Sequence, residues 1–404
     1  MVPSAIAKQL GLKTSSSGSW LDDFLDRLSR DNSIELAIFT YSNIQTKIAV
    51  ETNNVKCYIF PGGGKKLLFY SRSVKIELLN VIESFKPDLI HLHGTEYSMG
   101  YALSKINIAT PKLLTIQGIL NEIYPNTYGG LDFFTLFRMQ SFYEITHLNG
   151  AIFLKLMFKK NAVREKKIIK SFKYVTGRTD WDKNVVTKIN PQITYYRSYY
   201  NLRNSFYDAK KWSFKRGNHV IYCGGGSYPL KGMHMLFKAI ELVKFKYPDV
   251  KLIVPGIENK PKYKNGYLNY LSNLKSKLGL NDNVCYVGNI DADDIIKKMQ
   301  SSSVCVVSSA MEGASATIRE AMFLGVPCIA SARGGMTNLI DNGISGYTYD
   351  YNDYKTLSNL IITLFEDEKK ARSFSEKSIK FAEKIHDREA NYNRLIEIYE
   401  ELLN

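Results

Sequence analysis

The stretch from Val304 to Tyr347 constrains the fold of this chain more than any other part of it. It contains a short apolar run (304–307), a polar turn (308–316), a segment of helical character (317–324) and a second apolar run (328–331). We predict a strand, a helix and a parallel strand in that order. Ligands of such sheets bind at the carboxyl ends of the strands, so the turn is the first candidate for a binding site.

Two carboxylates flank the predicted start of this helix. Glu312 lies in the turn, and Glu320 lies one turn into the helix. The N-terminus of a helix favours phosphate because it presents free N–H groups and a partial positive charge. Small residues let a ligand approach this backbone closely: Gly313, Ala314, Ser315 and Ala316. Carboxylates on both sides can accept hydrogen bonds from sugar hydroxyls, so the pattern predicts a site for a nucleotide diphosphate joined to a sugar.

The same residues also allow a purely structural interpretation. Thr317 and Glu320 have the spacing of a capping box, in which the glutamate folds back onto the start of its own helix. For Glu320 taken alone, the two interpretations are equally open.

The longer motifs of the stretch resemble a known family. The E-x7-E from Glu312 to Glu320 is followed by A-M-x-x-G-x-P, G-G and N-G-x-x-G. This combination resembles the signature of family 4 of the retaining glycosyltransferases. The resemblance implies the GT-B fold, an α/β architecture of two Rossmann-like doubly wound domains that face each other across a cleft. It implies an acceptor-binding domain over 1–208, a nucleotide-sugar-binding domain over 209–385, and a C-terminal helix over 386–404 that packs back on the first domain.

The resemblance also implies roles for individual residues. Glu320 would bind the ribose hydroxyls, Glu312 would hold the donor sugar as a catalytic residue, and Lys231 would neutralise the leaving diphosphate. Further donor-binding candidates are Gly226, Gly313, Ser315, Ala316, Thr317 and, in the first domain, Gly18. The nucleotide-diphosphate sugar would be the donor substrate, and neither a metal nor a cofactor would be needed.

The sequence departs from the family pattern at two glycine loops. After the predicted strand 219–223, the family carries an Arg and a Lys; Lys231 matches the Lys, whereas Gly226 occupies the Arg position. Near the start, Gly18 stands alone where the family has two glycines. The strand that precedes that loop in the family is missing here or reduced to a residue or two. We therefore expect a natural start upstream of Met1.

Polar residues follow the predicted strands of the first half. The resemblance places these strand ends at the cleft, so His93 is a catalytic candidate, and Glu96, Gln117 and Arg178 are acceptor-binding candidates. For His93, a hydrogen-bonded structural role is equally open. Many relatives have a histidine where Gln117 stands, and an amide cannot act as a base.

Two other motifs carry less weight. The glycine-rich loop over 61–66 lacks the order of a phosphate-binding P-loop, so we interpret it as a flexible loop. The D-x-D at Asp291 and Asp293 resembles a metal-binding motif of the other glycosyltransferase fold. It precedes a predicted helix, so we interpret it as a helix cap.

The composition limits the partners and the location. A net charge of +15 suits a partner with phosphates, and no nucleic-acid-binding motif accompanies it. The segment 151–173 mixes lysines with aromatic and aliphatic residues; it predicts either a helix that docks on an anionic membrane or a helix with a solvated basic face. No apolar run of membrane-spanning length, no signal peptide and no metal-ligand spacing of the five cysteines is visible. We expect a cytoplasmic protein, peripheral at the inner face of the membrane.

The implied function is that of a retaining, metal-independent glycosyltransferase of the hexosyltransferase type. It would move a sugar from a nucleotide diphosphate to a hydroxyl of a glycan or lipid-linked acceptor, in cell-surface polysaccharide biosynthesis. Two alternatives remain open. A nucleotide-sugar 2-epimerase would need more carboxylates and histidines in the cleft than we find. A non-catalytic lipid- or glycan-binding protein fits the departures at Gly226 and Gln117.

Overall fold

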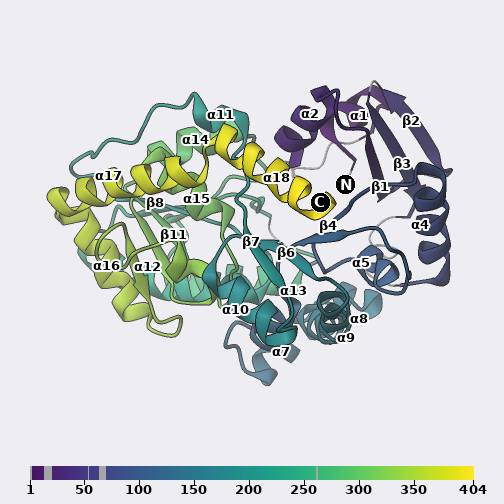
Figure 1. Cartoon of the computed structure of the whole chain (residues 1–404). Coiled ribbons are helices and arrows are strands. Elements are labelled where there is room, and N and C mark those ends of the chain that lie inside the picture. Colours follow the sequence, from purple (N-terminus) through teal and green to yellow (C-terminus); the bar gives the residue numbers. More distant parts are fainter. Residues whose placement is uncertain (1, 13–20, 53, 63–69, 261–262) are drawn as a thin grey trace.

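The structure is a computed structural model, and it describes residues 2–12, 21–52, 54–62, 70–260 and 263–404. Two α/β units follow each other along the chain, and the last helix returns from the second unit to the first (Figure 1). None of the helices in the described part is long and apolar enough to cross a bilayer.

The strands of the first unit form two sheets. One sheet has the order β1-β3-β2, and the other has the order β4-β5-β6-β7. All pairs are parallel except β2 with β3. The strands are β1 (Leu36–Ser42), β2 (Ile48–Thr52), β3 (Val55–Pro61), β4 (Ile90–His93), β5 (Lys112–Thr115), β6 (Tyr174–Gly177) and β7 (Thr194–Arg197). Strand β2 was not predicted; it continues the sheet as an antiparallel neighbour of β3.

Helices cover both faces of these sheets. Helix α4 buries Val74, Leu78 and Val81, which recur at helical spacing and turn one apolar stripe to the strands. The helices are α1 (Ser4–Gln9), α2 (Asp22–Arg30), α4 (Arg72–Phe85), α5 (Ser98–Leu103), α6 (Leu120–Asn126), α7 (Phe133–Met139), α8 (Phe142–His147), α9 (Ala151–Lys170), α10 (Asp180–Ile189) and α11 (Asn204–Tyr207).

The second unit has one parallel sheet with the order β10-β9-β8-β11-β12-β13. Its strands are β8 (Val220–Cys223), β9 (Lys251–Val254), β10 (Val284–Tyr286), β11 (Val304–Val307), β12 (Cys328–Ser331) and β13 (Tyr347–Tyr349). Every residue of β11 and β12 is buried, as expected for inner strands covered on both faces.

The helical elements of the second unit are η2 (Pro229–Lys231), α12 (Met233–Lys246), α13 (Gly266–Lys277), α14 (Ala292–Gln300), α15 (Ala316–Leu324), η3 (Gly334–Asn338), α16 (Tyr354–Glu366), α17 (Glu368–Ile385) and α18 (Arg388–Leu403). The prediction for the D-x-D is confirmed: Asp291 is the N-cap of α14, and its carboxylate accepts a hydrogen bond from the N–H of Asp294.

Helix α18 packs against the first unit (Figure 1). Leu395 lies in a cluster with Phe24, and Ile398 packs with Leu113 of β5. The Tyr399 hydroxyl lies 2.7 Å from Nδ1 of His91 on β4. The chain therefore ends beside the strands of its first half. The exact limits of the predicted domains, at 208/209 and 385/386, stay predictions.

The segment after β5 reaches across to the second unit. The carbonyl of Gly129 accepts hydrogen bonds from Nε2 of His234 (2.9 Å) and from the hydroxyl of Tyr351 (2.8 Å). A Cβ on Gly129 would lie 2.2 Å from the carbonyl oxygen of Pro229, and the φ of Gly129 is +56°, so only glycine suits this position. These contacts fix how the two units face each other.

Candidate active site

The candidate site is built around the turn between β11 and α15. Helix α15 begins at Ala316, and the side chain of its N-cap, Ser315, makes no capping hydrogen bond. The first N–H groups of a helix have no intrahelical partner, so this start can receive an anion. A Cβ on Gly224 would lie 2.9 Å from Oγ1 of Thr317, which places the loop after β8 beside the helix start.

Lys231 and Glu312 meet in this turn. Nζ of Lys231 donates to Oε2 of Glu312 at 2.8 Å, and the Ser309 hydroxyl donates to the same oxygen at 3.1 Å. Both charged side chains are largely buried, and the negative charge of Glu312 raises the pKa of Lys231 above its ordinary value. The two residues predicted to hold the diphosphate and the donor sugar therefore lie together as an ion pair.

Gly226 lies directly against the stem of Lys231. A Cβ at position 226 would approach Cγ and Cβ of Lys231 to 2.3 and 2.4 Å. A larger residue, such as arginine, would have to displace the Lys231 side chain. The glycine at position 226 therefore allows Lys231 to lie where it does.

Glu320 pairs with an arginine that caps α11, between the strands of the two units. Oε1 of Glu320 accepts from Nη2 of Arg203 at 2.7 Å and from its Nε at 3.1 Å. Burial raises the pKa of Glu320, and Arg203 offsets part of that effect. Because the carboxylate points to Arg203 and α15 has no side-chain cap, the capping-box interpretation is wrong. Sequence reasoning missed Arg203, which lies 117 residues away in no motif.

Glu96 and His93 lie at the end of β4. Oε1 of Glu96 accepts from the N–H of Gly118 at 2.7 Å, and burial raises the pKa of Glu96 to about 7, with a smaller effect from Glu165. Burial lowers the pKa of His93 to about 4, and its ring lies 3.9 Å from the ring of His91, centroid to centroid. Near pH 7, His93 is therefore neutral, whereas Glu96 can take up and release a proton.

Arg178 and Gln117 are engaged with the backbone and with Tyr200. Nη2 of Arg178 donates to the carbonyls of Ile116 (3.1 Å) and Gln117 (2.9 Å), and its guanidinium lies over the Tyr200 ring. Nε2 of Gln117 donates to the Tyr200 hydroxyl at 3.1 Å. These contacts fix the segment that follows β5, so Arg178 has a structural role in addition to any contact with an acceptor.

The candidate donor-binding residues of the second unit meet the candidate acceptor-binding residues of the first unit at Gly313. A Cβ on Gly313 would lie 3.7 Å from the carbonyl oxygen of Gln117 and 3.6 Å from the ring of Trp181. The turn of the second unit therefore touches the strand ends of the first. Gly18, the remaining donor-binding candidate, lies outside the described residues.

The sequence analysis missed one buried carboxylate, Glu165, which stabilises the part of the candidate site that the first unit contributes. Glu165 on α9 accepts hydrogen bonds from the Thr95 hydroxyl (2.6 Å) and from the N–H groups of Leu120 (2.9 Å) and Asn121 (2.8 Å). It thereby ties the loop that carries Glu96 to the start of α6. Glu165 is the one acidic residue between 151 and 170, and this was the only sign in the sequence that its role differs from that of its basic neighbours.

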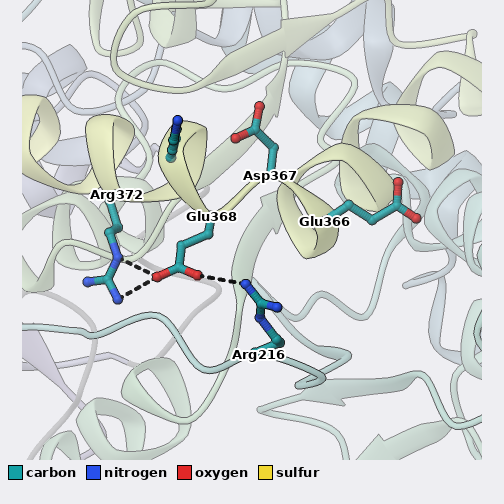
Figure 2. A pocket seen from close by; sticks show the side chains of 6 residues that line it. Arg216, Glu366, Asp367, Glu368 and Arg372 are labelled. Atoms are coloured by element: carbon teal, nitrogen blue, oxygen red, sulfur yellow. Dashed lines mark hydrogen bonds and ion pairs between the residues drawn. The ribbon is translucent and has the colours of Figure 1, made fainter.

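A pocket outside the candidate site is lined by charged side chains that the candidate site does not use. It lies at the junction of α16 and α17, where Glu368 pairs with Arg216 and Arg372 (Figure 2). Its remaining lining residues are Glu366, Asp367 and Lys369. Over the described residues, no cluster of three or more His, Cys, Asp or Glu side chains could hold a metal ion.

Comparisons with known proteins point to one class of enzyme. Residues 206–381 match the sequence profile described as "Glycosyl transferases group 1". MJ1069 of Methanocaldococcus jannaschii, named an uncharacterized glycosyltransferase, is 23% identical over 403 residues, which cover 95% of this chain and 94% of that protein. YtcC of Bacillus subtilis is 26% identical over 197 residues; this match covers about half of each protein, 48%.

Solved structures show the same fold. Sucrose-phosphate synthase from Thermosynechococcus elongatus superposes with a TM-score of 0.67 at 18% identity, covering 91% of this chain and 89% of that one. Anabaena HepE, solved in complex with UDP and glucose, gives 0.63 at 18% identity and covers 86% and 87%. The predicted resemblance to glycosyltransferases and the predicted GT-B fold are confirmed.

The buried Glu96 generates a prediction about stability and pH. The folded protein holds the Glu96 proton more tightly than the unfolded chain does, because burial raises this pKa from 4.5 to about 7. The stabilising contribution is therefore complete below about pH 4.5 and is lost as the pH rises through 7. In Glu96→Gln this dependence disappears. Between pH 4.5 and 8, the difference in unfolding free energy between parent and variant should change by roughly 3 kcal/mol, measured by urea denaturation.

Glu83→Gln, a change at an exposed carboxylate of α4, is the matched control and should follow the parent across the same range. If the difference between parent and Glu96→Gln is constant from pH 4.5 to 8, Glu96 titrates like an exposed carboxylate and the proposed proton exchange is wrong.

Proposed function

We propose that this chain, whose residues 206–381 form a group 1 glycosyltransferase domain on the GT-B fold, moves a sugar from a nucleotide diphosphate to an acceptor hydroxyl with retained anomeric configuration. The observation that carries the proposal is the pair of partly buried carboxylates around the start of α15, each held by a cation from another element. Glu320 would bind the ribose hydroxyls, and Glu312 would hold hydroxyls of the donor sugar. The donor would be a nucleotide hexose, and no metal would take part.

The chemical step needs positive charge at the diphosphate. The bond from the sugar C1 to the diphosphate oxygen breaks, the bond from C1 to the acceptor oxygen forms, and the acceptor proton passes to the departing diphosphate. That group gains negative charge, which Lys231 and the N-terminus of α15 would stabilise. In this account the diphosphate draws Lys231 away from Glu312, and the freed carboxylate then binds the sugar. The complex of HepE with UDP and glucose supports a nucleotide-sugar donor for this fold.

The candidate acceptor-binding residues support a glycan or a lipid-linked glycan as the acceptor. Glu96, with its pKa near 7, lies at the end of β4 and can accept a hydrogen bond from an acceptor hydroxyl. His93, Gln117 and Arg178 would shape the same wall. An acceptor of this class would place the enzyme in the synthesis of a cell-surface polysaccharide.

A surface of the first unit fits docking at the inner, anionic face of a membrane. We define the aromatic surface as Phe133, Phe134 and Phe137 of α7 with Phe142 of α8; these side chains are 60%, 75%, 62% and 82% exposed. Large exposed apolar groups in one short segment mark an interaction site. The exposed residues of α9 are mostly basic and include Lys159, Lys160, Lys166 and Lys167. Aromatic insertion beside basic charge suits a peripheral protein on anionic lipid.

The donor site generates a prediction about two glutamates. Glu320→Ala should weaken nucleotide binding about 10- to 100-fold, because a hydrogen bond to a charged group is worth roughly 1.5–3 kcal/mol. Glu312→Ala should mainly slow transfer. Calorimetry with nucleoside diphosphates and release of nucleoside diphosphate from a panel of nucleotide sugars, with and without acceptor, separate the two effects.

The exposed Glu389→Ala of α18 provides the control and should match the parent. If Glu312→Ala and Glu320→Ala both release nucleoside diphosphate at the parental rate, the site assignment is wrong. Binding of a nucleotide sugar without any acceptor-dependent release would favour a non-catalytic binding protein.

The absence of a metal from the proposed step generates a second prediction. Lys231 and the start of α15 already supply positive potential at the diphosphate, so the transfer rate should persist in excess chelator. Rates measured after dialysis against EDTA test this. Activity that disappears with EDTA and returns with manganese would contradict it.

The aromatic surface generates a third prediction. Replacing its four phenylalanines by serine should lower sedimentation with anionic liposomes at least tenfold, because each interfacial phenylalanine adds up to roughly 1.5–3 kcal/mol of apolar burial. Replacing Lys159, Lys160, Lys166 and Lys167 by glutamate should abolish it at low salt, since each basic residue contributes about 1 kcal/mol near such a surface.

Phe245→Ser is the matched control, because Phe245 is 81% exposed but lies on α12 of the second unit. It should sediment like the parent, and nucleotide binding should be the same in all variants. Equal sedimentation of the parent and both sets of variants, or no sedimentation of the parent, would mean that these residues are a solvated face.

A further inference from the structure

Arg319 is a buried arginine beside the candidate donor site that the proposed reaction has not used. It lies in the first turn of α15, directly before Glu320, and is 6% exposed. Its Nε and Nη1 atoms are shielded from solvent, and neither has a hydrogen-bond partner among the described residues. Burying a guanidinium without such partners is costly, and burial accordingly lowers the pKa of Arg319 to about 10. Arg319 therefore carries buried N–H donors that the described part of the chain does not use.

A second buried arginine, Arg178, lies close to Arg319 and comes from the first unit. After the larger effect of burial, the positive charge of Arg178 also lowers the pKa of Arg319, so the two guanidinium groups are within electrostatic reach of each other. The Nε of Arg178 is buried and, within the described ranges, has no hydrogen-bond partner. Like charges repel more strongly out of water, so an anion between the two side chains would remove a cost that they share.

The carboxylates that adjoin these arginines are engaged by other groups. Glu320 pairs with Arg203, at 2.7 and 3.1 Å. Asp182 accepts from the backbone N–H of Arg178 at 3.0 Å and from a tyrosine hydroxyl. Across the residues that the structure describes, neither Arg178 nor Arg319 forms an ion pair. The protein therefore brings together two buried cations without giving either of them a carboxylate partner in this part of the chain.

Both arginines adjoin the turn that begins α15. Nη2 of Arg178 donates to the carbonyl of Gln117 at 2.9 Å, and that same oxygen lies 3.7 Å from where a Cβ on Gly313 would be. Arg319 is part of the first turn of the helix that follows Gly313. Burial raises the pKa of the Tyr200 hydroxyl, and both arginines act against that effect, so both are near this one side chain. The two guanidinium groups thus come together where the two units meet.

We propose that Arg178 and Arg319 form a subsite for a phosphoryl group, to which each unit contributes one arginine. A guanidinium presents its N–H groups as a planar fork that matches the oxygens of a phosphate, and two such forks at one place suit a dianion. Because the two cations come from separate units, the bound group would also hold the units together. In the absence of the arginine that the family carries at position 226, this subsite would supply positive charge from another part of the fold.

The choice of a phosphoryl group rests on the proposed function. Two sources share this chemistry: the diphosphate of the nucleotide sugar and a phosphate group on the acceptor. Competition distinguishes them. If a saturating nucleoside diphosphate abolishes the binding of inorganic phosphate, the donor supplies the group. If the effects of nucleoside diphosphate and inorganic phosphate on thermal unfolding are additive, the acceptor supplies it.

Thermal unfolding of the parent and of Arg319→Met tests the subsite. In phosphate-free buffer, the variant should unfold at the parental temperature or above it, because the substitution removes a buried charge and no hydrogen bond of the described residues. Inorganic phosphate should raise the unfolding midpoint of the parent, and this rise should be lost in the variant. In calorimetry, the Kd of the variant for inorganic phosphate should be about tenfold higher or more, since hydrogen bonds to a charged group are lost.

Two further variants make the result specific. Arg319→Lys keeps the charge without the planar fork, so it should recover part of the phosphate-induced rise. Arg372→Met removes an exposed arginine of α17 and should show the full parental rise. Any stabilisation by phosphate that remains in Arg319→Met measures the nonspecific effect of this salt on folding.

An equal phosphate-induced rise in the parent and in Arg319→Met would overturn the proposal, and so would a parent that shows no rise. A lower unfolding midpoint of Arg319→Met in phosphate-free buffer, with parental affinity for phosphate, would give Arg319 a structural role instead. Sugar transfer by a parent without Arg319-dependent phosphate binding would overturn the subsite and leave the proposed function standing. Arg319-dependent phosphate binding by a protein that transfers no sugar would support the subsite and contradict the proposed function.

Discussion

Two partly buried ion pairs organise the candidate site. Glu312 and Glu320 flank one helix start, where unpaired carboxylates out of water would each cost several kcal/mol. Lys231 from η2 and Arg203 at the start of α11 remove that penalty, each from a different element. The turn, the loop after β8 and the start of α11 can therefore reach low energy only when all three come together. The site is charge-balanced before a donor arrives, and a diphosphate would exchange one of these partners.

The contacts between the units give that site a second wall. The carbonyl of Gly129 is held by His234 and Tyr351, and the N–H of Trp181 donates to Oδ1 of Asn338 at 3.1 Å. Burial lowers the pKa of His234 to about 4, so this histidine is neutral near pH 7, and Nε2–H can donate to the carbonyl. These bonds hold the turn at Gly313 against the end of β5. The candidate donor and acceptor residues thus lie close together although they come from separate sheets.

The sequence pattern predicted the features that depend on residues close together along the chain. Strands β11 and β12 have the predicted limits, and α15 begins one residue before the predicted start. Asp291 caps α14 as expected. These features follow from hydrophobic period and capping chemistry, both of which are visible within a dozen residues.

What sequence reasoning missed depends on partners far apart in the chain. Glu320 fits a capping box by its spacing, and only a folded chain brings Arg203 to it. The sequence places Glu165 in a basic helix, and only the folded structure shows that α6 and Thr95 surround it.

A crystal structure of the protein with a nucleotide sugar tests the central claim most directly. The account predicts ribose hydroxyls within hydrogen-bond distance of Glu320 and the diphosphate at Lys231 and the start of α15. It also predicts that Glu312 has exchanged Lys231 for a sugar hydroxyl. A donor bound elsewhere, or one bound here while the Lys231–Glu312 pair stays intact and the sugar contacts neither glutamate, would contradict it.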